Sequence, residues 1–88
     1  MYSFEFDENK SLKNKQKHGI DFVEAQKLWE YPKKKIFPAK NLDEARYILH
    51  SYLNGKCWSA IFTIRGGNIR IISVRRCRKK EEIILNES

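Results

Sequence analysis

Two glycine-containing dipeptides divide the second half of the chain into three β-prone segments, and their spacing constrains the fold more than any other feature. Asn54-Gly55 and Gly66-Gly67 tolerate the positive φ angles that two-residue hairpin turns require. The flanking residues are rich in β-branched and aromatic side chains, which predicts strands at 46–52, 57–65 and 68–74. We therefore expect a three-stranded antiparallel meander.

Two-residue turns also define which residues face each other across this sheet. They place Leu53 opposite Lys56 and Arg65 opposite Asn68, and side chains then alternate between two faces. The apolar face consists of Tyr47, Leu49, Trp58, Ala60, Phe62, Ile64, Ile69 and Ile71. We expect this face to form the core.

The opposite face is predicted to be basic. Arg46 should oppose Thr63, Thr63 should oppose Arg70, and Arg65 should lie one diagonal step away. Rigid guanidinium groups on this face would be suited to a ribose-phosphate backbone. Arg75 has the wrong parity, and it reaches this face only if the strand ends or bulges after Ser73. A second pair on this face, His50 opposite Ser59, is expected to be structural.

The first half predicts a short strand and a surface helix. Alternating aromatic and polar residues at 2–6 favour a half-buried strand. Asp7 is a plausible N-cap for a helix that runs to about His18 and ends at Gly19. Leu12 is its one strong apolar anchor. The exposed side of this helix should display Lys10, Lys13 and Lys17.

A second helix is indicated directly afterwards. Asp21 and Glu24 have the spacing of a capping box, and Pro32 should end the helix near Glu30. Its apolar stripe, which should cover the core face, consists of Phe22, Ala25, Leu28 and Trp29. The other segments are expected to form an edge strand at 33–38, a polar loop at 41–44 and a short helix near 81–85.

Size and charge restrict the classes of function. A chain of 88 residues forms one domain, 1–88, and its net charge of +7 favours a polyanionic partner. We expect a cytoplasmic protein without membrane contact, because neither a signal peptide nor a membrane-length apolar stretch is present. Metal-ligand spacings and phosphate-binding glycine loops are also absent. Cys57 and Cys77 are expected to be reduced thiols.

The run from Arg65 to Lys80 contains seven basic residues and no acidic residue. A solvated surface is the simplest interpretation of such a run. Arg65 and Arg70 alternate with isoleucines, however, which predicts that a sheet holds these arginines in fixed positions. Arginines held in this way favour phosphate binding over a merely solvated surface. Arg76 and Lys79 extend the same run. Lys17 and His18 complement the negative end of a helix dipole, and the histidine could also transfer a proton near neutral pH.

Several short motifs occur in an order that resembles BrnT-type toxins. The first half of the chain carries Phe4–Lys10 and Lys17–Ile20, and the second half carries Arg46-Tyr47, Arg65-Gly66 and Arg70–Arg75. The resemblance extends to about residue 81. It implies a RelE-like α+β fold, with two N-terminal helices on a twisted antiparallel sheet and a short C-terminal helix.

This resemblance also implies a function. It suggests a metal-independent endoribonuclease toxin of a type II toxin-antitoxin system, without a cofactor, that inhibits translation by cutting RNA. The implied partner is a BrnA-like ribbon-helix-helix antitoxin, which neutralises the toxin in a hetero-oligomer and binds operator DNA. Carried over to this chain, the catalytic candidates are Lys17, Arg65 and Arg75. The RNA-binding candidates are His18, Arg46, Arg70, Arg76 and Lys79.

Two other functions remain open from the residues alone. A non-catalytic RNA- or DNA-binding module would use the same arginines only to hold phosphate. A protein-interaction domain would dock an acidic partner on the same face. RNA that is bound but not cut distinguishes the first from an enzyme, and complex formation that RNA does not compete with distinguishes the second.

Overall fold

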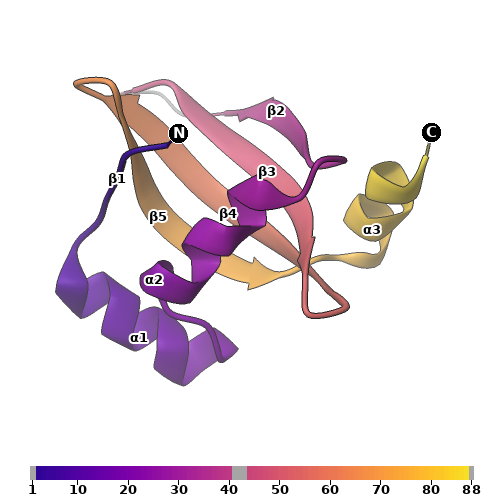
Figure 1. The fold of residues 1–88 in the computed structure, drawn as a ribbon, viewed down its shortest axis with the longest axis horizontal. Coiled ribbons are helices and arrows are strands. Elements are labelled where there is room, and N and C mark those ends of the chain that lie inside the picture. Colours follow the sequence, from indigo (N-terminus) through magenta and orange to yellow (C-terminus); the bar gives the residue numbers. More distant parts are fainter. Residues whose placement is uncertain (1, 41–43, 88) are drawn as a thin grey trace.

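The structure is a computed structural model and describes residues 2–40 and 44–87. A five-stranded sheet with the order β1-β5-β4-β3-β2 forms its centre, with α1, α2 and η1 on one face and α3 near one end (Figure 1). The elements are β1 (Phe4–Glu5), α1 (Glu8–His18), α2 (Phe22–Ala25), the 3₁₀ helix η1 (Gln26–Glu30), β2 (Lys35–Ala39), β3 (Arg46–Leu53), β4 (Lys56–Arg65), β5 (Asn68–Arg76) and α3 (Lys79–Asn86). The α+β class is confirmed.

Both predicted hairpins are confirmed with their registers. Leu53 pairs with Lys56 and Arg65 pairs with Asn68. Both residues of each turn have positive φ, including Asn54 at 53°. The predicted edge strand is β2, which pairs with β3 alone. Of the polar loop expected at 41–44, residues 41–43 lie outside the described residues.

The first strand corrects the prediction of a wholly antiparallel sheet. β1 pairs in parallel with β5, through Phe4 with Ile69 and Glu5 with Arg70. The sheet is therefore mixed. Local sequence does not determine this direction, because most of the chain separates the two strands and β1 only has to reach the free edge of β5.

The helix boundaries follow the predicted caps. The Asp7 carboxylate accepts a hydrogen bond from the Lys10 amide at 3.1 Å, and Gly19 ends α1 with φ 82°. Asp21 and Glu24 form the full capping box. The expected second helix is shorter in its α-helical part than predicted, because the chain tightens into the 3₁₀ helix η1 after Ala25 and ends at Glu30.

The inner face of the sheet and the α2–η1 segment form the core. Trp29 packs its ring edge-on against Phe4 and Phe62, with centroids 5.1 and 5.2 Å apart. All but two members of the predicted apolar face are buried. Tyr47 is half-buried against the core, and Ile64 is 52% exposed beside the Gly66-Gly67 turn.

Polar residues, rather than the predicted Leu12, anchor α1. Leu12 is 64% exposed, whereas Ser11 and Asn14 are buried. The Ser11 hydroxyl accepts a hydrogen bond from the Phe22 amide at 2.9 Å. The Asn14 amide donates to the carbonyls of Ile20 and Val74 at 2.8 and 2.9 Å, and its oxygen accepts from the Val74 amide at 3.1 Å. The helix therefore docks on β5 through hydrogen bonds to backbone that would otherwise be unpaired.

A β-bulge at Ile72 changes the faces of the last strand. Ile61 pairs with Ser73 while its neighbour Phe62 pairs with Ile71, so Ile72 is the extra residue. A one-residue shift moves every later side chain to the other face. Val74 consequently enters the core, fully buried. The shift also places Arg75 opposite Ser59 on the outer face. The bulge that this required was expected after Ser73 but lies one residue before it, at Ile72.

The expectation of two reduced cysteines is wrong in this structure. Cys57 and Cys77 form a disulfide, with Cα atoms 5.3 Å apart. Regular pairing from the hairpin would place Arg76 opposite Cys57. The bulge instead pairs Trp58 with Arg76, and the Cys77 amide then donates to the Cys57 carbonyl at 3.0 Å. The disulfide depends on this one-residue shift, whereas the expectation of reduced thiols rested only on the number and spacing of the cysteines.

The last helix, α3, packs against the end of β3. The Lys35 ammonium donates to the carbonyls of Ile84 and Glu87 at 2.6 and 2.7 Å, and the Tyr52 hydroxyl donates to Glu82 at 2.9 Å. These contacts hold the helix over one end of the outer face. Among the described residues, no helix has both the length and the apolar character needed to cross a membrane.

Candidate nucleic-acid interface

The outer face of the sheet carries the predicted basic residues. Thr63 pairs with Arg70, and Ser59 pairs with both His50 and Arg75 in the neighbouring strands. Because paired residues point to the same side of a sheet, Arg70 and Arg75 share the face of Thr63 and Ser59. The sequence register therefore identifies this face correctly.

Carboxylates from other parts of the chain form ion pairs with the arginines of the outer face. Arg70 donates to Glu5 at 2.8 Å, and this hydrogen bond is the main cause of the lowered pKa of Glu5. Glu44 lies 3.5 Å from Arg46 and 3.6 Å from Arg65. The guanidinium groups are thus held in place, but part of their charge is compensated within the protein.

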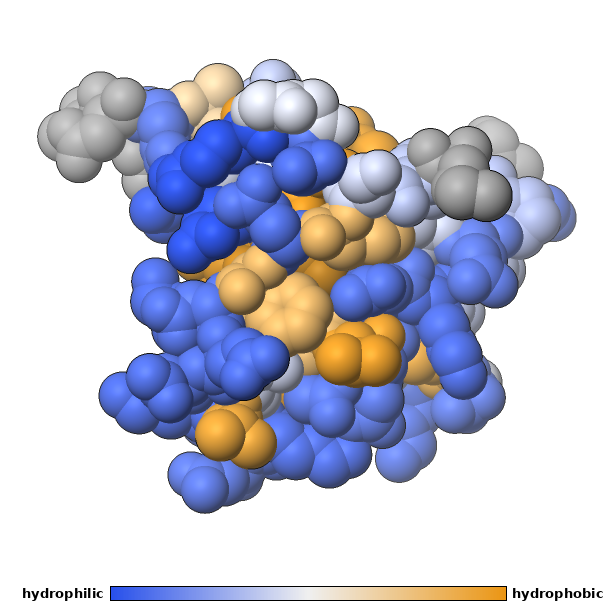
Figure 2. Space-filling view, turned by 60° about the vertical axis from the view of Figure 1, so that its left-hand side comes forward, coloured by the Kyte–Doolittle hydropathy of each residue, from blue (hydrophilic) through white to orange (hydrophobic). Residues whose placement is uncertain are grey.

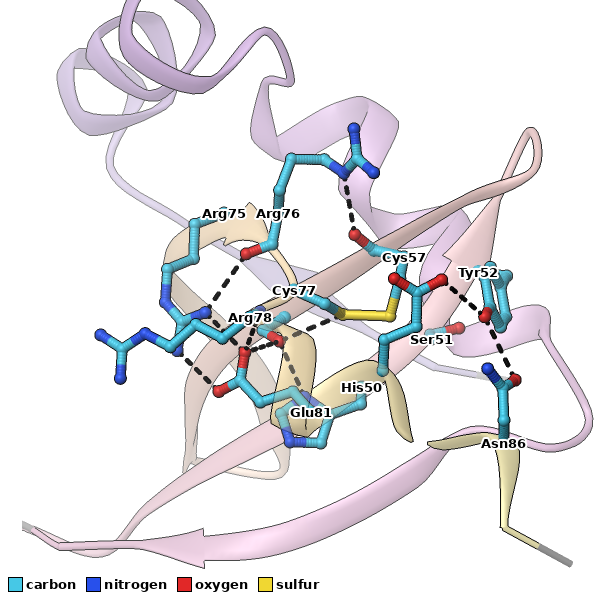
Figure 3. The surroundings of a disulfide bond; sticks show 12 residues. His50, Ser51, Tyr52, Cys57, Arg75, Arg76, Cys77, Arg78, Glu81 and Asn86 are labelled. Atoms are coloured by element: carbon cyan, nitrogen blue, oxygen red, sulfur yellow. Dashed lines mark hydrogen bonds and ion pairs between the residues drawn. A yellow bond between two sulfur atoms is a disulfide. The ribbon is translucent and has the colours of Figure 1, made fainter. Parts of the chain in front are cut away.

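Among the ion pairs of the outer face, the one between Arg75 and Glu81 on α3 has the shortest distance. The two guanidinium nitrogens donate to the two carboxylate oxygens at 2.7 and 2.9 Å (Figure 3). Hydrogen bonding by Arg75, assisted by the Arg78 amide, lowers the pKa of Glu81 to about 2. The same contact raises the pKa of Arg75. This bidentate geometry fixes the orientation of the Arg75 guanidinium group.

These ion pairs correct the expectation of guanidinium groups presented freely to RNA. Arg70 and Arg75 each carry a short contact to an internal acid, and Arg46 and Arg65 share Glu44. The sequence could not show this, because Glu5 and Glu81 lie outside the basic run and reach it only through β1 and α3. A phosphate on this face competes with internal carboxylates.

The catalytic candidates Arg65 and Arg75 lie far apart. Arg75 pairs with Ser59, which is six positions before Arg65 on the same strand. At about 3.3 Å per residue this separates them by roughly 20 Å. The two arginines therefore cannot grip one phosphate together.

Lys17 and His18 lie beside the bulged part of β5, in a hollow of about 180 Å³. Its lining consists of Lys10, Lys13, Asn14, Lys17, His18, Ile72 and Ser73. We call it the α1–β5 hollow. Lys10, Lys13 and Lys17 are exposed as predicted, and none forms an ion pair with another described residue.

The position of the hollow links it to the outer face. Ser73 lies on the outer face between Arg70 and Arg75, and it also lines the hollow. The lysines of α1 therefore flank the same stretch of β5 as the two arginines. The side of the molecule that carries α1 is largely hydrophilic, with a smaller apolar group near its centre (Figure 2).

The remaining predicted residues lie elsewhere. Arg76 pairs with Trp58, so it lies on the inner face rather than the outer face. Its guanidinium carbon lies 5.5 Å from the centroid of the Trp58 ring. Lys79 is exposed at the start of α3. His50 is buried, and its Nδ1 lies 2.7 Å from the Ser59 hydroxyl oxygen, in agreement with a structural role.

The Arg75–Glu81 pair should be visible in the pH dependence of stability. Glu81 has a depressed pKa in the folded chain, so its contribution is complete above the ordinary value of 4.5 and is lost as the pH falls towards about 2. This shift corresponds to at most about 3 kcal/mol. Urea unfolding of wild type and Glu81→Gln should therefore show a stability difference that shrinks by this amount over the same pH range.

Glu87→Gln is the matched control, since Glu87 is exposed at the end of the same helix. Its stability difference from wild type should stay constant as the pH falls. A constant difference for Glu81→Gln as well would contradict the importance of its pair with Arg75.

Sequence reasoning missed the residues that organise the site. Asn14 anchors α1, and Glu5 and Glu81 position the arginines. Glu5 offered one signal, because it lies on the polar side of the predicted first strand. Asn14 offered a weaker one, since Ser11 and Asn14 are three positions apart and share one side of the helix.

A comparison with family models matches most of the chain. Residues 6–81 match the family model described as ribonuclease toxin, BrnT, of type II toxin-antitoxin system. A comparison with curated proteins found no match. The matched region includes α1, the hairpins, the bulged β5 and Glu81. With 76 of its 88 residues inside the match, the chain belongs to the BrnT family of ribonuclease toxins of type II toxin-antitoxin systems.

Proposed function

We propose that this BrnT-type toxin cleaves RNA without a metal ion, with the scissile phosphate held at the α1–β5 hollow. The observation that carries the proposal is the convergence of Lys17 and His18 on β5 where Ser73 joins the hollow to the outer face. The described residues that line the α1–β5 hollow are basic or neutral. They include no carboxylate, the ligand that Mg²⁺ prefers, and this supports a reaction without a metal ion.

The reaction is attack of a ribose 2′-hydroxyl on the adjacent phosphate. It requires in-line positioning, compensation of charge on the phosphoryl oxygens, and proton transfer. Lys17 carries a positive charge that is not ion-paired within the described residues, so it is assigned to the phosphoryl oxygens. His18, its neighbour in the hollow, is assigned to proton transfer.

The arginines then act around this centre. Arg75 is held by Glu81 and has N–H groups beyond those in the carboxylate contact, so it contributes as a positioned donor beside the phosphate. Arg65 is too far away to share that phosphate, and we assign it to the RNA backbone outside the centre. Arg46, Arg70 and Lys79 extend this backbone contact.

The proposal includes the wider biology of such a toxin. Cutting RNA would inhibit translation in the cytoplasm, and a BrnA-like ribbon-helix-helix antitoxin would neutralise the toxin in a hetero-oligomer that binds operator DNA. Helices on one face of a small twisted sheet support a RelE-like fold. The basic hollow and outer face are the surfaces that an acidic antitoxin segment would cover.

The test uses purified protein, single-stranded RNA and an excess of a metal chelator. We expect chain cleavage with 2′,3′-cyclic phosphate ends, because the 2′-hydroxyl is the nucleophile. RNA that is shifted in a gel but not cut would favour the non-catalytic binding module. Cleavage that stops with the chelator and returns with Mg²⁺ would contradict the metal-independent reaction.

A further inference from the structure

Three side chains with metal-binding atoms, those of His50, Cys77 and Glu81, meet at the disulfide, next to the proposed RNA site. Cys57, Cys77, His50 and Glu81 come from β4, the segment after β5, β3 and α3 (Figure 3). One ligand atom from each of His50, Cys77 and Glu81 lies within 4.8 Å of the others. The Cys57 sulfur is bonded to that of Cys77.

We propose that reduction of this disulfide creates a site for one Zn²⁺ ion, with the two thiolates, His50 and Glu81 as ligands. A phosphine supplies the two electrons: with one water it converts the disulfide into two thiols and becomes the phosphine oxide. Zn²⁺ then replaces the two thiol protons, which are released to solvent. The oxidised chain lacks the site because the thiolate is the metal-binding form of cysteine.

The donor set has the chemistry of zinc. Thiolate sulfur and imidazole nitrogen favour Zn²⁺, and a carboxylate commonly completes a tetrahedron. Bond lengths of about 2.0–2.3 Å place tetrahedral ligands about 3–4 Å apart. Separations up to 4.8 Å between His50, Cys77 and Glu81 therefore require only a small contraction.

A supporting contact already orients the histidine. The Ser59 hydroxyl is fully buried and lies 2.7 Å from Nδ1 of His50. This contact fixes the orientation of the imidazole ring at the cluster, as hydrogen bonds to metal-binding histidines commonly do. The same hydroxyl oxygen lies 3.1 Å from a Glu81 carboxylate oxygen and 3.5 Å from the Cys77 sulfur, so it contacts three of the ligands. Ser59 is a positioning residue in this proposal.

The charges close to the cluster balance when the ion is bound. Two thiolates and the Glu81 carboxylate carry three negative charges, and Zn²⁺ with the guanidinium of Arg75 carries three positive charges. Arg78 and Lys80 also line the neighbouring hollow, where water reduces their effect. That hollow of about 390 Å³ is lined by His50 and Glu81 and gives an ion a route to the cluster.

The test compares oxidised and phosphine-reduced protein titrated with Co²⁺, a spectroscopic substitute for Zn²⁺. After thiol counting confirms reduction, we expect one Co²⁺ per chain, thiolate-to-cobalt charge-transfer absorption and tetrahedral ligand-field bands. Zn²⁺ should displace the Co²⁺. Oxidised protein should bind at least about 100-fold more weakly, and reduced Ser59→Ala about 10- to 100-fold more weakly than reduced wild type.

Variants then identify the ligands. Cys77→Ser should weaken Co²⁺ binding and at least halve the charge-transfer absorption per chain, and Glu81→Gln should weaken binding while Glu82→Gln, its neighbour on α3, should not. Circular dichroism checks folding, and the wild-type comparison remains decisive where a variant unfolds. The proposal is overturned if the disulfide resists reduction in the folded chain, if reduced wild type binds no Co²⁺, if folded Cys77→Ser binds normally, or if two chains share one ion.

Discussion

Replacing Lys17 with alanine should lower the rate of RNA cleavage about 100- to 1,000-fold. Lys17 lies in the α1–β5 hollow, where its ammonium group is assigned to charge that develops on the phosphoryl oxygens. An interaction that strengthens in the transition state appears mainly in kcat. Single-turnover cleavage of a short RNA, with circular dichroism to confirm folding, measures the effect directly.

Three further variants make this result specific. Lys27→Ala removes the same charge from an exposed position on η1 and should cleave at nearly the wild-type rate. Arg65→Ala should raise KM and leave kcat almost unchanged, because about 20 Å separates Arg65 from the position of Arg75. Lys17→Arg should recover much of the lost rate. Unchanged cleavage by Lys17→Ala, or an equal loss of kcat in Arg65→Ala, would refute the proposed centre.

Replacing Asn14 with alanine should lower the free energy of unfolding by about 4 kcal/mol. The truncation removes the partners of both polar backbone groups of Val74 and of the Ile20 carbonyl, in a buried place. Each unsatisfied group costs about 1–3 kcal/mol. Urea unfolding measures this loss of stability. If the m value is unchanged, the loss arises from the folded state.

Asn9→Ala is the control for this variant, because Asn9 is exposed on the same helix. Its free energy of unfolding should stay within about 0.5 kcal/mol of wild type. A loss below about 1 kcal/mol for Asn14→Ala would mean that α1 is held mainly by other contacts. Asn14 also lines the proposed RNA site, so the variant is expected to cleave more slowly as well.

Much of the fold could be predicted because its determinants are local. Asp7 and Gly19 delimit α1, and Asn54-Gly55 delimits the first hairpin, through conformations that depend on a few neighbouring atoms. Once both turns were assigned two residues, side-chain alternation gave the correct register as far as Ile71. The basic character of the outer face followed from the same alternation.

The site itself was only partly predictable, since its geometry depends on residues far apart in the chain. Lys17 and His18 were identified as candidates, and the structure places them in one hollow with Ser73. Arg65 and Arg75 were expected to act together, but the pairing of Arg75 with Ser59 separates them. The acids that hold the arginines come from β1 and α3, and no local pattern connects those segments to the basic run.

By itself, the sequence determined the order of the elements, the helix caps, the two tight turns and the family. Only the tertiary structure decided the last part of β5, where the bulge at Ile72 places Val74 in the core, Arg75 on the outer face and Cys77 beside Cys57. One extra residue reverses the face of all that follow. Just past the bulge, the amide of Asn14 binds the backbone of Val74 from 60 positions away, a distance that no local pattern in the sequence can span.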